Sequence, residues 1–441
     1  MKILIITTYF APDTAMGGKR PYTFAKYLAQ FGHDVTVVRS GEILATIDPA
    51  LEFEKYGIKV ISYLGEDSPA EKFRRGEITN KDIKRAQSRI SFIPVKIRKK
   101  ISNAYHQIFK GYEYSKECKA AENYLEKMKG TLDSLKDEHF DVVFSTYGRL
   151  ENIYGGEYAK RVLGCPWIND LRDRVTHDRD PIAHRMQLKT EQDYFLKSDA
   201  CVAVSGSHCD DLRERYPSLN VNLIYNGYEC DFEDTVEPVA KENRLTLCYT
   251  GSMYTGALDL SLLFKAFAVL ESKGTINLDN ITFAYAGGEF EYLQAQAAKH
   301  GVDRILVNKG FLSRADVRQL QCSSDIYVVS ARNIQHYLDE IPGKIYEGIS
   351  AGRPILTVVN GTTTGGELKQ LQDKYHYGYC YEQGGGHEAF EELCRYLAKA
   401  YKSSTKEALL AFDQPEELVE DFKYPNLTRK LESIMESLCN K

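Results

Sequence analysis

The sequence predicts an α/β protein made of two Rossmann-like domains. Short apolar segments alternate with longer segments of helical character over residues 2–225, and the same alternation repeats over residues 245–359. Strands that alternate with helices form parallel sheets with right-handed crossovers. A chain of 441 residues is also too long for one hydrophobic core. We therefore expect two domains, over residues 1–230 and 245–415, with ligands at the carboxyl ends of their strands.

The first domain opens with a βαβ unit. Strands are expected at residues 2–7 and 35–38, joined by a glycine-containing loop and a helix over about 21–32. Residues 70–130 have a basic, helical pattern, and we interpret them as an insertion. The remaining strands of this domain are expected at residues 58–61, 142–145, 166–169, 200–204 and 223–225.

A polar, acidic segment without periodicity, residues 229–244, predicts a linker between the domains. The chain ends in an amphipathic helix over about residues 416–438, which follows two prolines. Strands of the second domain are expected at residues 245–249, 282–286, 305–308, 325–329 and 355–359.

Composition argues against several classes of function. A net charge of −5 gives no general attraction for nucleic acid. The N-terminus is an expected strand rather than a signal peptide, and no apolar run is long enough to span a membrane. The ten cysteines form no C-x-x-C pair, which predicts reduced thiols in a cytoplasmic protein. The histidines show no metal-binding spacing, so we expect no metal site.

The most informative segment is residues 339–354. Pro342 suits the first turn of a short helix, and Gly352 ends that helix. Lys344 and Glu347 lie three residues apart, so they share one face at the electropositive end of the helix. Such a place can hold an anionic phosphate beside sugar hydroxyls. An ordinary capped helix with surface charges has the same features.

A second candidate is the glycine pair that follows the first strand. Gly17 and Gly18 allow the backbone to approach a phosphate, and Arg20 adds positive charge nearby. The loop matches neither a dinucleotide-binding nor a nucleoside-triphosphatase motif. A tight turn without a ligand is the alternative interpretation.

The segment 339–354 resembles the donor-binding signature of family 4 glycosyltransferases, in which an acid, a lysine and a second acid precede a turn of small residues. The resemblance implies catalytic roles for Lys344 and for Asp339 or Glu340, because either acid can fill the first position. It implies that Glu347 binds the ribose. It also implies the GT-B fold, in which two Rossmann-like domains face each other across a deep cleft. In that fold a terminal helix, here about 416–441, returns to the first domain.

Other segments resemble the same family in the same order along the chain. The resemblance implies that the backbone of Gly17 and Gly18 meets the donor's pyrophosphate and that Gly251 and Ser252 open the donor loop of the second domain. The basic pair that usually follows in this loop is absent. We therefore expect Lys344 to neutralise the phosphates, with Arg20, Arg172 or Arg332 as a second cation.

Two further segments complete the resemblance. In relatives the residues after the corresponding glycine present backbone groups to the base, so Phe311 and Leu312 are base-pocket candidates, although core packing suits Phe311 as well. Residues 166–173 resemble the P-W-x-x-D-x-R-D stretch of capsule and lipopolysaccharide enzymes. This implies that Arg172 and Asp173 contact the acceptor or a phosphate.

The resemblance implies a retaining glycosyltransferase that moves a sugar from a nucleotide-sugar, expected to be UDP-linked, to a polyprenyl-linked or saccharide acceptor. Its place would be bacterial surface polysaccharide synthesis, with no cofactor and no metal. Two alternatives remain: a nucleotide-sugar 2-epimerase of the same fold, and a non-catalytic scaffold, which the missing basic pair suggests.

Residues 81–116 suggest an additional partner. This segment carries ten lysines and arginines against two acids, together with regularly spaced apolar residues. A basic amphipathic helix can lie on an anionic membrane surface without spanning it. We therefore expect peripheral attachment to the inner face of the plasma membrane. A solvated helical face packed on the first domain is the alternative.

Overall fold

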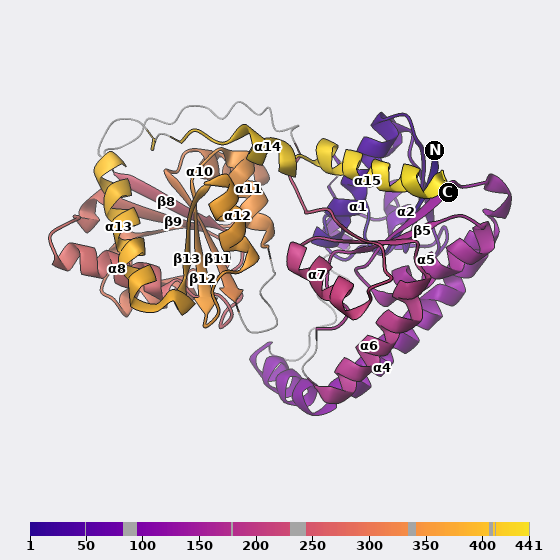
Figure 1. The fold of residues 1–441 in the computed structure, drawn as a ribbon, viewed down its shortest axis with the longest axis horizontal. Coiled ribbons are helices and arrows are strands. Elements are labelled where there is room, and N and C mark those ends of the chain that lie inside the picture. Colours follow the sequence, from indigo (N-terminus) through magenta and orange to yellow (C-terminus); the bar gives the residue numbers. More distant parts are fainter. Residues whose placement is uncertain are drawn as a thin grey trace. The chain divides into compact units, whose positions relative to one another are not determined.

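The computed structural model describes residues 1–48, 50–82, 95–177, 180–229, 244–333, 341–404, 409–410 and 412–440. The chain forms two compact units. Unit 1 contains residues 1–225 and 427–441, and unit 2 contains residues 226–426. Each unit is an α/β structure with its own parallel sheet (Figure 1).

The sheet of unit 1 has seven strands in the order β3-β2-β1-β4-β5-β6-β7, and all its pairings are parallel. The strand order reverses between β1 and β4, so the crevice beyond their carboxyl ends is a place where ligands bind in such sheets. The strands are β1 (Lys2–Thr7), β2 (Asp34–Arg39), β3 (Lys59–Ser62), β4 (Val142–Thr146), β5 (Trp167–Leu171), β6 (Ala200–Ala203) and β7 (Val221–Leu223).

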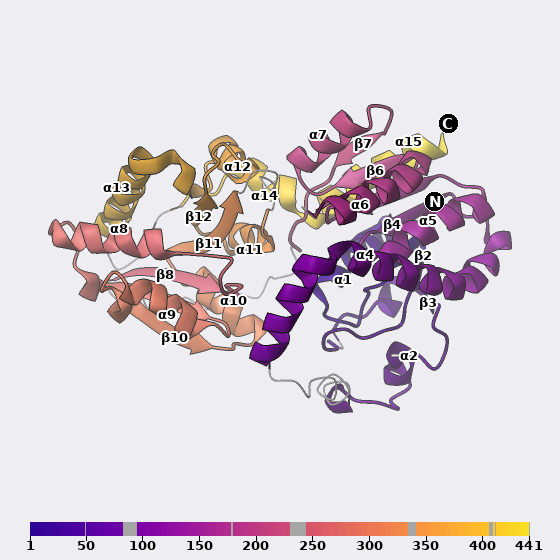
Figure 2. The same cartoon turned by 90° about the horizontal axis from the view of Figure 1, so that it is seen from below.

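Helices cover both faces of this sheet. The described part of α4 packs against α5 and α6 over one face, where Trp167, Met128 and Leu132 are fully buried (Figure 2). On the other face Phe24 of α1 packs edge-on against Phe144, with ring centroids 5.8 Å apart. The helices are α1 (Met16–Gln30), α2 (Pro69–Arg74), α4 (Val95–Asp133), α5 (Leu150–Leu163), α6 (Pro181–Tyr194), α7 (Gly206–Arg215) and α15 (Tyr424–Cys439).

The sheet of unit 2 has six parallel strands in the order β10-β9-β8-β11-β12-β13. Its strand order reverses between β8 and β11, so the loops after these two strands frame the expected ligand position. The strands are β8 (Leu245–Thr250), β9 (Ile281–Ala286), β10 (Leu306–Gly310), β11 (Ile326–Asn333), β12 (Ile355–Gly361) and β13 (Gly378–Glu382). The sequence pattern missed β13, because tyrosine, cysteine and a flanking glycine give it little apolar signal.

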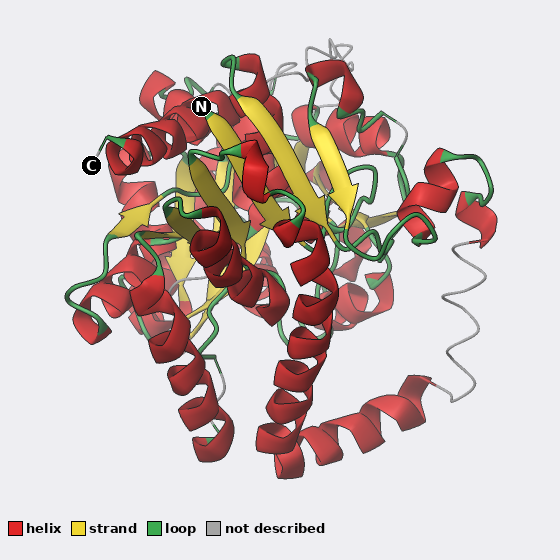
Figure 3. Cartoon of the chain, turned by 90° about the vertical axis from the view of Figure 1, so that its right-hand side faces the viewer, coloured by secondary structure: helices red, strands yellow, loops and turns green. Residues whose placement is uncertain are grey.

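Helices also cover both faces of the second sheet. Figure 3 colours the chain by secondary structure and shows, facing the viewer, helices around the strands of unit 1. Helices α8, α9 and α13 pack over the face that carries Leu247 and Phe283. Helices α10, α11 and α12 contact strands β8, β11, β12 and β13. The helices of unit 2 are α8 (Ser261–Ser272), α9 (Phe290–Ala298), α10 (Arg314–Cys322), α11 (Gly343–Ala351), α12 (Glu367–Tyr375), α13 (Gly386–Ser404) and α14 (Glu416–Phe422).

Helix α1 begins earlier than predicted. It starts at Met16 rather than near residue 21, so Gly17 and Gly18 lie in its first turn and not in a loop. Paired glycines disfavour a helix interior, which is why the sequence pattern placed them outside. Pro21 lies inside the helix, past its first turn, where its missing N–H removes one helical hydrogen bond.

The predicted insertion over residues 70–130 is only partly separate from the domain. Tyr114, Ala121 and Met128 of α4 are buried in the main core of unit 1. This part of α4 therefore lies in the crossover between β3 and β4 and packs into the core of unit 1. Residues 83–94, and the side chains of residues 95–109, lie outside the described part of the structure.

The predicted C-terminal helix is two helices rather than one. Helix α14 ends at Phe422, Lys423 adopts extended backbone angles, and α15 starts at Tyr424. Helix α14 belongs to unit 2, where Phe422 packs against Tyr346 of α11. Most of α15 belongs to unit 1, where Glu432 accepts a hydrogen bond from His33 at 2.7 Å.

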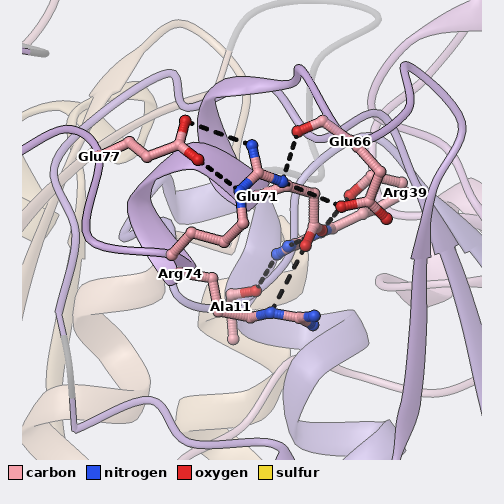
Figure 4. A network of polar contacts seen from close by, with 8 residues as sticks. Ala11, Arg39, Glu66, Glu71, Arg74 and Glu77 are labelled. Atoms are coloured by element: carbon pink, nitrogen blue, oxygen red, sulfur yellow. Dashed lines mark hydrogen bonds and ion pairs between the residues drawn. The ribbon is translucent and has the colours of Figure 1, made fainter.

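A buried ion pair connects β2, α2 and the loop after β1 (Figure 4). The Arg39 guanidinium donates to Glu71 at 3.0 Å and to the carbonyl oxygen of Ala11. Ser62 also donates to Glu71, at 2.7 Å. Because Ala11 lies in the loop that leads into α1, this network fixes the backbone before Gly17.

The described residues contain neither a membrane-spanning helix nor a disulfide bond. Within these ranges no helix is sufficiently long and apolar to cross a membrane. The nine cysteines that the structure describes are all free thiols.

Candidate functional site

Helix α11 presents both residues that the sequence analysis emphasised. Its first residue is Gly343, directly after Pro342, and it ends at Gly352, which has a left-handed φ of 64°. Ile345, Tyr346 and Ile349 form the buried face. Lys344 and Glu347 lie off that face and are half-buried.

Lys344 extends to the loop that follows β8. Its Nζ lies 3.4 Å from the carbonyl oxygen of Ser252 and 5.2 Å from the centre of the Tyr249 ring. A side chain at Gly251 would place its Cβ 3.3 Å from Cε of Lys344, so a glycine leaves room for the lysine. Burial lowers the pKa of Lys344, and the charges of Glu347 and Glu289 oppose this effect. The lysine therefore provides the positive charge that this loop itself lacks.

The loop after β8 is held by side chains that the sequence analysis did not identify. Glu289, at the start of α9, accepts hydrogen bonds from the N–H groups of Met253 at 2.7 Å and Thr255 at 3.3 Å. The Tyr285 hydroxyl donates to the carbonyl oxygen of Gly251 at 3.1 Å. An acid at the start of a helix usually indicates only a favourable interaction with the helix dipole, so no local signal pointed to this role of Glu289.

Glu347 has buried partners on two other elements, α10 and β11. One carboxylate oxygen, Oε2, accepts hydrogen bonds from Gln321 and Tyr327, each at 3.1 Å. Gln321 also donates to the Thr250 hydroxyl at 3.1 Å. Glu347 is therefore part of a hydrogen-bonded network and not a solvated surface charge.

Phe311 lies in the loop after β10 and is 89% exposed. Its ring lies against Gly288, where an added Cβ would come within 2.8 Å of Cζ of the phenyl ring. The core-packing interpretation of Phe311 was therefore wrong. Leu312 is half-buried beside it.

The remaining unit 2 candidates are less defined. Asp339 and Glu340 fall outside the described residues. Arg332 is exposed near the end of β11.

In unit 1, Arg20 is buried inside the fold. Its guanidinium makes a bidentate ion pair with Asp170, at 2.8 to 3.1 Å, and donates to the carbonyl oxygens of Ile224 and Tyr225. Side-chain exposures of 3% for Arg20 and 0% for Asp170 leave little surface for a ligand. These contacts tie α1 to β5 and to the segment after β7.

Arg172 lies in a different environment, beyond the carboxyl ends of β1 and β4. Its Nε donates to the carbonyl oxygen of Tyr147 at 2.7 Å, and its guanidinium lies 5.3 Å from the centre of the Tyr9 ring. A Cβ added at Gly17 or Gly148 would come within 2.6 Å of the guanidinium nitrogens. Both glycines therefore make room for Arg172, which the sequence analysis did not foresee for Gly17.

The other unit 1 candidates flank this arginine. The amide of Gly18 donates to the carbonyl oxygen of Ala15 at 2.7 Å, within the first turn of α1. The Asp173 carboxylate is 66% exposed and lies 3.5 Å from Nε of Arg172. Nowhere in the described ranges do three or more metal-ligating side chains gather.

A comparison with known protein families finds a match within the second unit. Residues 232–408 match the family model of the glycosyl transferases group 1. No curated protein sequence matches the chain.

Several solved structures share the whole fold at low sequence identity. They include the lipopolysaccharide outer core galactosyltransferase WaaB, with a TM-score of 0.58, 14% identity and 99% coverage of both chains. HepE of Anabaena in complex with UDP has a TM-score of 0.55 and 13% identity, and covers 99% of this chain and 100% of its own. A sucrose-phosphate synthase of Thermosynechococcus elongatus has a TM-score of 0.57 and 12% identity, with 99% coverage of both chains.

The predicted fold class is confirmed: the two parallel-sheet, Rossmann-like units have the GT-B fold. Together with the match of unit 2 to the glycosyl transferases group 1, this fold indicates a glycosyltransferase.

Proposed function

We propose that this protein is a retaining glycosyltransferase of the family 4 type. It transfers a sugar from a UDP-linked donor to a polyprenyl-linked or saccharide acceptor in bacterial surface polysaccharide synthesis. One observation carries the proposal: Lys344 and Glu347 occur together on α11 beside the loop after β8, where the strand order of unit 2 reverses. Such positions are where parallel α/β sheets bind nucleotides.

The donor's diphosphate would bind at Lys344 and the first turn of α11. The N–H groups of a first helical turn have no partner within the helix, and this turn contains no acid that would compete for them. Breaking the anomeric C–O bond leaves negative charge on the diphosphate. Lys344 stabilises that charge as it grows, which accelerates the chemical step rather than only tightening binding.

The nucleoside would lie over two other elements of unit 2. Phe311 offers an exposed aromatic face on which a base can stack, with Leu312 beside it. Glu347 accepts a hydrogen bond from the ribose. Asp339 or Glu340 would hold the hydroxyls of the donor sugar.

Unit 1 would contribute Arg172 and Asp173, which contact the acceptor or a phosphate. Arg20 is omitted, because its ion pair with Asp170 already occupies the guanidinium. The structural neighbours support a UDP-linked donor, since HepE of Anabaena was solved with UDP and with UDP-glucose. The group that neutralises the diphosphate is a lysine, so we propose that the reaction needs no metal.

The scaffold alternative rested on the missing basic pair after Gly251. Lys344 reaches this loop and supplies a cation there, which favours a catalytic protein. No observation specifically favours the 2-epimerase.

A screen of nucleotide-sugars for thermal stabilisation, followed by transfer assays and NMR of the product anomer, tests the proposal. We expect UDP-sugars to stabilise the protein, and the product to keep the donor's anomeric configuration with EDTA present. Donor consumption without an acceptor would indicate the 2-epimerase. Absence of UDP and GDP binding at millimolar concentration would indicate the scaffold.

Substitution of Glu347 gives a residue-level test. Glu347→Ala should weaken UDP binding by about 1.5 to 3 kcal/mol, as expected for the loss of a hydrogen bond to a charged group. Calorimetric titration measures the affinity, and circular dichroism checks that the fold persists. Unchanged UDP affinity would exclude Glu347 from the site.

We also propose that the protein attaches peripherally to the cytoplasmic membrane face through residues 81–116. Most of this segment lies outside the described side chains, but Tyr112 is 53% exposed, with Lys116 4.4 Å from the centre of its ring. Vesicle sedimentation should show binding to anionic lipid that weakens at high salt. If the protein does not bind vesicles, or binds neutral and anionic vesicles equally, this segment has no electrostatic role at the membrane.

A further inference from the structure

Four polar side chains from four elements of unit 2 form a closed ring of hydrogen bonds. Thr250 ends β8, Gln321 lies on α10, Tyr327 lies on β11 and Glu347 lies on α11. The Gln321 amide nitrogen is 3.1 Å from both Oγ1 of Thr250 and Oε2 of Glu347. The Tyr327 hydroxyl is 3.0 Å from the Thr250 hydroxyl and 3.1 Å from the same Oε2.

The direction of each hydrogen bond in this ring follows from the groups present. A carboxylate only accepts, so the Tyr327 hydroxyl donates to Glu347. Tyr327 has a single proton, so the Thr250 hydroxyl donates to Tyr327, and Thr250 in turn accepts from Gln321. The second N–H of Gln321 donates to Glu347. Every bond in the ring is therefore satisfied in one arrangement, with Glu347 as the acceptor of two.

Three members of the ring are buried. Tyr327 is completely buried, and Gln321 and Thr250 are 4% and 3% exposed. Burial raises the pKa of Tyr327 well above its ordinary value, so its hydroxyl keeps its proton and remains a donor. Buried groups that have found all their partners do not reorient without leaving one of them unsatisfied.

This arrangement separates the two oxygens of Glu347. Oε2 is occupied by two donors, whereas Oε1 has no hydrogen bond to any residue in the described part of the chain. The carboxylate is thus held with Oε1 as the oxygen available to a ligand.

We propose that Gln321 and Tyr327 are positioning residues that orient Glu347 so that Oε1 accepts from a hydroxyl of the nucleotide's ribose. The inference rests on the proposed function, in which Glu347 binds the ribose. It adds that the donor site selects ribonucleotides over their deoxy analogues, and that this selectivity depends on two residues that do not touch the ligand.

The experiment compares Tyr327→Phe and Gln321→Leu in the full-length protein. Each removes a donor to Oε2 and changes side-chain volume little. Calorimetric titration is made with UDP, 2′-deoxy-UDP, 3′-deoxy-UDP and inorganic pyrophosphate. The matched control is Tyr377→Phe, which removes the hydroxyl of another buried tyrosine in unit 2 that donates to the carbonyl oxygen of Leu368 at 3.2 Å.

For the wild type we expect tighter binding of UDP than of at least one deoxy analogue. Tyr327→Phe and Gln321→Leu should each weaken UDP binding by about threefold to tenfold, in line with one lost hydrogen bond. They should also reduce the preference for UDP over that analogue and leave pyrophosphate binding unchanged. Tyr377→Phe should change none of these affinities.

A double variant separates this inference from the proposed function. In the Glu347→Ala background, Tyr327→Phe should cause no further loss of UDP affinity, because its effect acts through Glu347. If Glu347→Ala weakens UDP binding but neither single variant does, the positioning role is wrong. An equal loss for UDP and pyrophosphate in the single variants would likewise overturn it. If Glu347→Ala does not change UDP affinity, the ribose-binding role of Glu347 in the proposed function is itself wrong.

Discussion

The surroundings of Lys344 make the protonation of its amine sensitive to a bound anion. It is half-buried, near an aromatic ring and one carbonyl oxygen, and burial lowers its pKa. A bound diphosphate would add negative charge beside it and favour the protonated amine. The charge that develops on the leaving diphosphate would strengthen this interaction during the reaction.

Lys344→Ala should therefore lower turnover more than donor affinity. We expect a decrease in kcat of about a hundredfold, as for the loss of one preorganised electrostatic contact. Steady-state kinetics and UDP titration measure the two quantities separately. Lys369→Ala serves as control, because Lys369 is a partly exposed lysine of the same unit that is paired with Asp373. Near-wild-type turnover of Lys344→Ala would show that another cation acts, with Arg172 and Arg332 the next to test.

At the scale of elements, the Arg39–Glu71 pair decides where the loop before α1 lies. It joins β2, α2 and the carbonyl of Ala11. Burial of the Glu71 carboxyl would by itself raise its pKa. Hydrogen bonds from Ser62 and Arg39, together with the positive charge of Arg39, outweigh burial and lower the pKa.

This shift makes the pair's contribution to stability depend on pH. Because the pKa of Glu71 is lower in the folded protein, the stabilisation is complete above the ordinary glutamate pKa of about 4.3. It is lost as the pH falls through the lowered value. Glu71→Ala should cost about 3 kcal/mol of unfolding free energy at neutral pH, since it leaves a buried arginine without its partner.

Denaturant unfolding at neutral and acidic pH measures this cost. The difference between wild type and Glu71→Ala should shrink in acid. Glu77→Ala is the matched control, because Glu77 pairs with Arg75 at the exposed surface of the same region (Figure 4) and should change stability little. If the difference in unfolding free energy between wild type and Glu71→Ala did not depend on pH, the stabilising role assigned to the ionised Glu71 carboxylate would be wrong.

At the scale of the whole molecule, each unit has its own sheet and core, so ligand effects can be assigned to one unit. Hydrogen exchange with and without UDP should show protection in the loop over residues 251–256 and at the start of α11. Residues of α13 serve as an internal reference and should not change, because that helix covers the opposite face of the sheet. Protection confined to unit 1 would place the nucleotide elsewhere.

The sequence alone determined the two parallel sheets and the helix that carries Lys344 and Glu347. Buried parallel strands are continuous apolar runs, and β1 has the predicted bounds. A proline before a helix and a glycine after it are local signals that need no tertiary contact, which is why α11 could be placed.

Tertiary structure alone decided the partners of these residues. Glu289 holds a loop that lies more than thirty residues earlier in the chain, and the ring around Glu347 draws Thr250, Gln321 and Tyr327 from three other elements. Arg20 and Arg172 both have glycines or acids near them in the sequence. Arg20 is nevertheless buried in an ion pair, whereas the guanidinium of Arg172 lies against two glycines. The local sequence pattern indicates the periodicity and the ends of a helix or strand. It does not record which side chains the crossovers bring together, and those contacts set the burial and hydrogen bonding of each residue.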